Sequence, residues 1–199
     1  LNVISVFSQP PRKSSGGQKI RKSAIHKYAK NLNLDIKTPK IIKDEEKFII
    51  NSNIDLGIVV AYGQIIPEKI LNCSKYGFIN IHASLLPKYR GAAPIQRSLI
   101  NLEKLTGISI MKINKYLDSG PVCNQYQISI NKNENFKTLS AKLSQLGADK
   151  IIENIELIFS NKAKFLEQVH SVATYANKIH KNEGKIDWKD SAINIIGKI

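Results

Sequence analysis

The stretch DLGIVVAYG at residues 55–63 decides the fold class of this 199-residue chain. It is a continuous apolar run, which is typical of a strand that is covered on both faces in a parallel sheet. A second strand is predicted for FINIHA at residues 78–83. Helical patterns alternate with strand patterns around them, and this alternation indicates an α/β protein with a doubly wound, mostly parallel, Rossmann-like sheet.

The remaining elements follow from hydrophobic spacing and from helix-capping residues. Apolar residues recur at helical spacing within 137–159, so their predicted role is core packing. The rhythm is lost from about residue 163, where we expect an extended linker that Trp188 docks against the core, followed by the first turns of a helix. Further strands are predicted at 1–7, 34–37, 106–113 and 121–130, and further helices at 24–31, 45–52 and 94–102.

Positive charge is concentrated near the beginning of the chain. The net charge is +14, but 26 of the 30 basic residues are Lys, and Lys, Ile and Asn share A/T-rich codons, so genome composition explains much of the total. Residues 1–34, however, hold seven basic side chains and no acidic one. Such clustering indicates a phosphate-binding surface, with a simple solvated face as the alternative. The seven are Arg12, Lys13, Lys19, Arg21, Lys22, Lys27 and Lys30.

Several function classes lose support from what the sequence lacks. No run approaches the roughly 18 apolar residues that span a bilayer. Cys73 and Cys123 match no metal-binding spacing, and the four His residues show no i, i+4 pair, so we expect no metal and reduced thiols in a cytoplasmic protein. No GxGxxG, GxxxxGK[ST] or GxSxG motif is present, which argues against nicotinamide, ATP-hydrolysing and serine-hydrolase enzymes.

A chemically capable group remains in INIHASLLPKYRGAAPIQRSL (79–99) and YLDSGPV (116–122). Asn80 and His82 are two apart on a predicted strand and therefore point to one face. There an amide can donate to a developing oxyanion, and an imidazole can exchange protons. Asp118, in a predicted turn, can orient His82 and take up a proton from a nucleophile. Taken singly, His82 is more simply a structural histidine and Asp118 a turn residue.

Together, the Asn-x-His, SLLPxxRG and LD[ST]G elements resemble the signature of the formyltransferase family that uses 10-formyltetrahydrofolate. The APIQ continuation and the basic loop are most similar to the members that formylate methionyl initiator tRNA, and VFSQP, DLGIVVAYGQIIP and TYANKIHKNEGKIDW extend the similarity. The resemblance implies that Asn80, His82 and Asp118 are the catalytic trio. It implies formyl transfer from 10-formyltetrahydrofolate to the α-amino group of methionine on initiator tRNA, for translation initiation, without a metal.

The resemblance also implies binding residues and a monomer. One departure from the family concerns tRNA: the central loop arginine of the family falls on Gly16, which leaves open which loop residue reads the tRNA. The acceptor end of a charged initiator tRNA is expected at Arg12, Lys13, Lys19, Arg21 and Lys22. The reduced folate is expected at Tyr62, Gln64, Ile65, Ile66, Ser84, Leu85, Leu86, Pro87 and Leu117.

Two length differences follow from the same resemblance. The family begins with another strand and helix before the segment that matches LNVISVF, and it ends with a small β-barrel domain after the linker. We therefore expect residues 1–162 to be a catalytic core without its first strand and helix, and residues 163–199 to be the linker and the start of a C-terminal domain. We expect this polypeptide alone to be marginally stable or inactive.

Three other interpretations stay open. One is a formyl-folate-dependent transferase for another amine, or a hydrolase of the same fold. The second is a basic RNA-binding module without catalysis. The third is a decayed, nonfunctional fragment.

Overall fold

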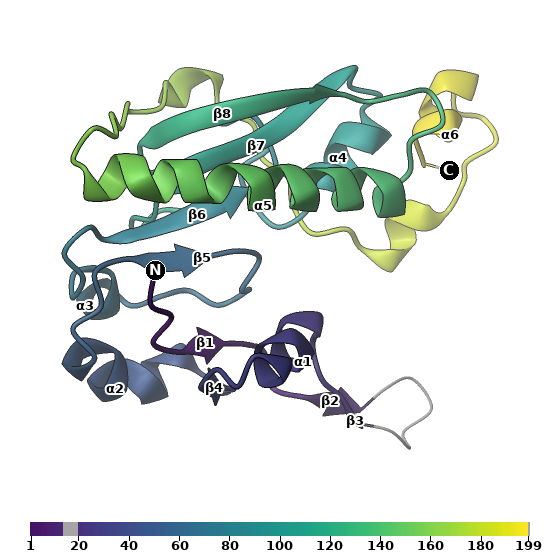
Figure 1. Cartoon of the computed structure of the whole chain (residues 1–199). Helices are drawn as coiled ribbons and strands as arrows, with labels where there is room; N and C mark the ends of the chain where they lie inside the picture. Colours follow the sequence, from purple (N-terminus) through teal and green to yellow (C-terminus); the bar gives the residue numbers. More distant parts are fainter. Residues whose placement is uncertain (14–19, 199) are drawn as a thin grey trace. The chain divides into compact units, whose positions relative to one another are not determined.

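A computed structural model describes residues 1–13 and 20–198, which divide into two compact units (Figure 1). The first unit consists of Leu1–Gly57 and Tyr62–Gly77. The second consists of Ile58–Ala61 and the chain from Phe78 onward. Each unit has its own buried apolar residues and is described separately below.

The first unit is built around a parallel pair of short strands joined by a helix. Strand β1 pairs with β4, and α1 lies between them in the sequence. The Ser23 hydroxyl caps α1 by accepting a hydrogen bond from the His26 amide at 3.1 Å. The elements are β1 (Val6–Phe7), β2 (Arg12–Lys13), β3 (Ile20–Arg21), α1 (Ala24–Asn31), β4 (Ile36–Lys37), η1 (Ile42–Glu45), α2 (Glu46–Asn51) and α3 (Glu68–Leu71). The buried apolar side chains are Ala29, Ile42, Ile49, Ile70 and Leu71.

The second unit contains a four-stranded sheet in the order β5-β6-β7-β8. Helix α5 packs against β7 and β8, with Leu139 and Leu143 of the helix buried beside Ile108 of β7; Figure 1 shows this helix running along the strands. Asn135 begins α5 with a reciprocal capping box to Thr138. The elements are β5 (Gly57–Val59), β6 (Phe78–His82), α4 (Pro94–Ile100), β7 (Leu105–Lys112), β8 (Val122–Ser129), α5 (Phe136–Phe159), η2 (His170–Val172), η3 (Lys181–Gly184) and α6 (Ala192–Lys198).

The α/β class is confirmed, and the sheet departs from the expected mostly parallel arrangement at one strand, β7, which runs opposite to both of its neighbours. Strand β6 pairs antiparallel with β7, and β7 pairs antiparallel with β8. The physical reason lies in the connection between β7 and β8, a turn of residues 113–121 without a helix. A parallel return needs a crossover of a dozen or more residues, whereas a short turn joins antiparallel strands. Within the described residues, no helix combines the length and apolar character needed to cross a membrane.

The segment after α5 is largely extended, as expected, and it follows the loops of the second unit. Leu166 forms an isolated bridge with Val122, and Tyr175 forms another with Arg90. The segment ends in the expected helix, α6. The expected docking of Trp188 is wrong, because its side chain is 80% exposed. Trp188 lies in a tight turn that the Asp190 amide closes onto the Asp187 carbonyl at 2.9 Å.

We expect Gly107→Ala to destabilise the second unit. A Cβ atom at this position of β7 would overlap the backbone carbonyl oxygen of Tyr126 and would lie 2.7 Å from Leu85 Cδ2. Overpacking of this kind lowers the free energy of unfolding by about 1–3 kcal/mol. Urea denaturation measures the loss, with Gly184→Ala as the control because nothing lies within 4 Å of that Cβ. Equal stability of the two variants would contradict the described strand packing.

The Arg97–Glu183 ion pair connects the segment after α5 to helix α4, and we expect this connection to weaken in acid. Arg97 Nη1 lies 2.6 Å from Glu183 Oε2, and this hydrogen-bonded guanidinium, helped by the His180 amide, lowers the pKa of Glu183 from 4.5 to about 2. Because the folded pKa is depressed, the contribution to stability is complete above pH 4.5 and is lost as the pH falls toward 2. A carboxyl-detected NMR titration should give about 2 for Glu183, and a value nearer 4.5 in Arg97→Gln. A pKa near 4.5 for Glu183 in the wild type would contradict this ion pair.

Candidate active site

His82 lies at the end of β6 and is held by two groups. Its side chain is 6% exposed. Nε2 lies 2.9 Å from the Tyr89 carbonyl oxygen, which can only accept, so Nε2 carries a hydrogen and donates it. Nδ1 is the remaining ring nitrogen, and it faces Asp118 Oδ2 at 3.7 Å. The ring is therefore oriented between a fixed carbonyl and a carboxylate.

The Asp118 carboxylate comes from the turn between β7 and β8. Its Oδ2 accepts a hydrogen bond from the Gly91 amide at 2.8 Å, and its Oδ1 accepts a long one from Asn80 Nδ2 at 3.5 Å. The Asp118 backbone has φ +44°, in the left-handed region. Asn80 and His82, which are two residues apart on β6, thus both reach the same carboxylate, and the structure brings the predicted trio together.

This arrangement provides the elements of acid–base and oxyanion chemistry. An imidazole and a carboxylate 3.7 Å apart approach hydrogen-bonding distance with a small movement, as catalytic groups often do when substrate binds. The amide of Asn80 offers N–H donors beside them. The three groups can therefore polarise a carbonyl and accept a proton at one place.

The loop after β6 is pinned by its own polar groups. The Ser84 hydroxyl donates to the Lys88 carbonyl at 2.6 Å, and the Leu86 amide donates to Ser109 Oγ at 3.0 Å. Gln125 Nε2 donates to the Leu86 carbonyl at 2.7 Å. Ser84 and Leu86 are buried, so their side chains support the loop from within.

A family model described as formyl transferase matches residues 1–155 of this sequence. The match includes the whole trio and the loop after β6. The chain belongs to the formyl transferase family. The family that the sequence motifs resemble is thereby confirmed.

Curated relatives of this formyl transferase are named methionyl-tRNA formyltransferase. The protein from Pelagibacter ubique (strain HTCC1062) is 58% identical over 200 residues, which cover 99% of this chain and 64% of that protein. The protein from Dictyoglomus turgidum (strain DSM 6724 / Z-1310) is 45% identical over 191 residues, covering 94% of this chain and 61% of that protein. The chain thus spans less than two thirds of the length of these two relatives.

Solved structures of other formyltransferases share the fold. A 4-N formyltransferase from Francisella tularensis superposes with a TM-score of 0.73 at 28% identity, covering 87% of this chain and 71% of that one. The N-formyltransferase from Helicobacter canadensis, solved with folinic acid and dTDP-3-aminofucose, superposes with a TM-score of 0.72 at 23% identity, covering 97% and 68%. The predicted formyltransferase fold is therefore confirmed.

The residues that the sequence assigns to folate fall in both units of this formyl transferase. Leu117, beside Asp118 in the second unit, is 62% exposed. In the first unit, Ile65 is 92% exposed, whereas Gln64 is engaged: its Oε1 accepts from the Ile42 amide at 2.7 Å. The Tyr62 hydroxyl is buried without a hydrogen-bond partner in the described part of the chain, and burial raises the pKa of Tyr62. The others are Ile66 of the first unit and Ser84, Leu85, Leu86 and Pro87 of the second.

The basic residues expected to bind tRNA lie partly on a hairpin of the first unit. Strands β2 and β3 pair antiparallel, and Arg12 lies directly opposite Arg21. Lys13 lies opposite Ile20, Lys22 follows the hairpin, and Arg12, Lys13, Arg21 and Lys22 are all exposed. Two like charges facing each other across a hairpin repel, so the arrangement gains stability from an anion. Lys19 and Gly16 lie outside the described residues.

The structure adds residues that the sequence analysis did not single out. Tyr89 and Gly91 hold His82 and Asp118 through backbone groups. Bonds from backbone groups cannot be predicted from residue type. Gly91 itself is required for a different reason, because it has φ +117° and a Cβ there would lie 2.9 Å from the Ala176 carbonyl oxygen. Gln168 also contacts the Asp118 turn, and its surrounding sequence EQVHS shows no recognisable motif.

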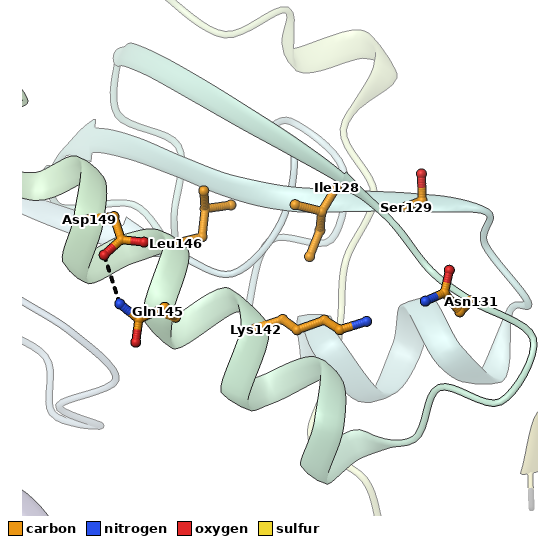
Figure 2. Close-up of a pocket in the computed structure, with 7 residues that line it drawn as sticks. All are labelled: Ile128, Ser129, Asn131, Lys142, Gln145, Leu146 and Asp149. Atoms are coloured by element: carbon orange, nitrogen blue, oxygen red, sulfur yellow. Dashed lines mark hydrogen bonds between the residues drawn. The ribbon is translucent and has the colours of Figure 1, made fainter.

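A shallow hollow of about 480 Å³ lies away from the trio, between the end of β8 and α5 (Figure 2). It is lined by Ile128 and Leu146 and by polar side chains, three of which (Lys142, Gln145 and Asp149) are hydrogen-bonded. Lys142 bonds to Glu134 at 2.6 Å, and Gln145 bonds to Asp149 at 2.7 Å. In the described part of the chain, no three His, Cys, Asp or Glu side chains are grouped to hold a metal ion.

Proposed function

We propose that this chain carries the catalytic centre of an enzyme that transfers a formyl group from 10-formyltetrahydrofolate to the α-amino group of methionine on initiator tRNA. The observation that carries the proposal is the Asp118 carboxylate, which reaches both Asn80 and His82. The relatives named methionyl-tRNA formyltransferase support the choice of tRNA as acceptor. The folate-bound formyltransferase from Helicobacter canadensis supports the choice of donor.

The trio has a defined task in this reaction. The uncharged amine of methionine attacks the formyl carbon, and a new C–N bond forms while the carbonyl oxygen becomes an oxyanion. Asn80 and the protonated form of His82, which then carries a hydrogen on Nδ1 as well, donate hydrogen bonds to that oxyanion, and Asp118 receives the proton from the attacking nitrogen through water. The bond between the formyl carbon and the folate nitrogen then breaks, and that nitrogen takes up a proton. No covalent enzyme intermediate is needed.

The proposed folate contacts are apolar side chains and backbone groups within each unit taken by itself. In the second unit these are Leu117 and the loop residues Ser84, Leu85, Leu86 and Pro87. In the first unit they are Tyr62, Gln64, Ile65 and Ile66. The high exposure of Ile65 and of Leu117 supports the proposal. Burying an exposed apolar side chain against an apolar ligand ring removes apolar surface from water, which favours binding.

The tRNA acceptor end is proposed to bind the β2–β3 hairpin. The facing pair Arg12 and Arg21 supports this, because a phosphate neutralises the repulsion between them. Lys13, Lys19 and Lys22 are proposed to add further phosphate contacts. We propose that the enzyme works as a monomer in the cytoplasm.

A second candidate is formyl transfer to an amino sugar. It is favoured by the folds that resemble this one, since several belong to sugar N-formyltransferases. One assay separates the candidates: the gene product that contains this chain is given 10-formyltetrahydrofolate with charged initiator tRNA, glycinamide ribonucleotide, a nucleotide-linked amino sugar, or water alone. Formylated methionyl-tRNA as the main product supports the proposal, and any other preferred acceptor overturns it.

We expect His82→Ala and Asp118→Ala to lower turnover strongly while tRNA binding is largely retained. Loss of one oxyanion donor or of the acid–base group lowers kcat by about 10²–10³-fold. Turnover is measured with saturating substrates, and tRNA affinity is measured by filter binding on the same preparations. Retained turnover in either variant would instead support a module that binds RNA without catalysis.

We expect Arg12→Glu and Arg21→Glu to weaken tRNA binding with little effect on kcat at saturating tRNA. Each lost phosphate contact should lower the slope of log affinity against log salt by about 1. Lys132→Glu, an exposed lysine of the second unit, is the matched control for the same charge change. Equal weakening by all three variants would mean that only the total charge matters.

A further inference from the structure

Gln168 spans the turn that carries Asp118. It comes from the extended segment after α5, and its side chain is 7% exposed. Its single amide nitrogen, Nε2, donates to the backbone carbonyls of Asp118 at 2.9 Å and Gly120 at 2.7 Å. Both of its amide hydrogens are therefore used on the two residues that flank Ser119. One side chain thus fixes the backbone on both sides of the turn.

Arg90 fixes the orientation of Gln168. The guanidinium donates twice to Gln168 Oε1, from Nε at 3.0 Å and from Nη2 at 2.7 Å. Nη2 also lies 3.0 Å from His170 Nδ1. Because Oε1 is held by two charge-assisted bonds, the amide cannot rotate, and Nε2 is kept toward the Asp118 turn.

Burying the charged side chain of Arg90 costs free energy of folding. Arg90 is 3% exposed, and within the described residues no carboxylate lies within ion-pair distance of it. A buried charge without a counterion costs free energy that an apolar side chain would not. Arg90 is also the residue between Tyr89, whose carbonyl holds His82, and Gly91, whose amide holds Asp118. Arg90 therefore lies between the backbone group that holds His82 and the backbone group that holds Asp118.

Asp118 needs such support because its backbone is strained. A non-glycine residue at φ +44° lies in the left-handed region, which side chains disfavour, so the turn persists where surrounding bonds hold it. A shift of the turn would lengthen the 2.8 Å bond from the Gly91 amide and the 3.7 Å approach to His82. Placement of the carboxylate thus depends on bonds to backbone atoms of the turn.

We propose that Gln168, oriented by the buried Arg90, is a positioning residue that holds Asp118 in its working geometry. The proposal rests on the function proposed above, because it assigns a catalytic consequence to the placement of Asp118. Gln168 acts only through Asp118 and does not touch the reacting atoms.

The decisive variant is Gln168→Glu in the gene product that contains this chain. It keeps an oxygen acceptor for Arg90 but replaces the two N–H donors to the Asp118 turn with a carboxylate oxygen. We expect kcat for formyl transfer to fall by about 10–100-fold, with the KM values for tRNA and formyl-folate little changed. The loss should disappear when Asp118→Asn is already present, because the positioned carboxylate is then absent. An undiminished loss in that background, or an unchanged kcat, overturns the proposal.

Asn154→Asp is the matched control for loss of a buried amide. Asn154 is fully buried, and its Nδ2 donates to Tyr126 Oη at 2.9 Å and to the Lys150 carbonyl at 2.8 Å, so its bonds run to β8 and α5. We expect this variant to lose stability while kcat is retained. A similar fall in kcat for both variants would mean that Gln168 has a general structural role.

A second measurement needs no activity. The Gly91 amide is bonded to Asp118 Oδ2, so its hydrogen exchange reports the position of that carboxylate. Gln168→Asn, which keeps an amide but shortens its reach, should speed Gly91 exchange by about tenfold and leave exchange in the β7–β8 ladder unchanged. Unchanged Gly91 exchange overturns the positioning role. If the wild type formylates another acceptor, the proposed function fails, and this readout still decides the role of Gln168.

Discussion

The hydrogen bond from the Gly91 amide to the Asp118 carboxylate is the contact on which the candidate site depends. It joins the loop after β6 to the turn between β7 and β8 at 2.8 Å. The same loop supplies the Tyr89 carbonyl that orients His82. In the antiparallel β6–β7 pair, His82 lies opposite Ser109 and Ile79 opposite Lys112, so the loop after β6 and the turn after β7 leave from opposite ends of the pair and this bond joins them. This bond ties the carboxylate to the same loop that orients the imidazole.

The extended segment after α5 braces both halves of this arrangement. The Arg90 amide donates to the Thr174 carbonyl at 2.9 Å, and the Ala176 amide donates to the Arg90 carbonyl at 2.7 Å. From the same segment, Gln168 bonds to the Asp118 turn. A segment that is only a linker by sequence therefore forms part of the scaffold of the site. Its contribution comes largely from backbone bonds, which tolerate many side chains.

Particular residues show how far the sequence could predict this structure. Asn80 and His82 could be placed on one face because the side chains of a strand alternate with a period of two. Helix α1 could be placed because Ser23 is a good N-cap, and the structure shows that cap. The reversed direction of β7 was missed because an apolar strand pattern is similar in both kinds of sheet. Trp188 was misplaced because apolar character alone does not decide burial.

The sequence by itself determined the family and the α/β class and predicted the three side chains of the candidate site, because these depend on residue types at fixed spacings along one chain. The tertiary structure alone decided how those side chains are held. Residues 28 and 50 positions away from Asp118 are involved: Arg90 orients Gln168, and Gln168 bonds to the turn. Arg90 belongs to the SLLPxxRG element, but neither that element nor the sequence around Gln168 reveals their contact, since hydrogen-bond geometry depends on the folded path of the chain.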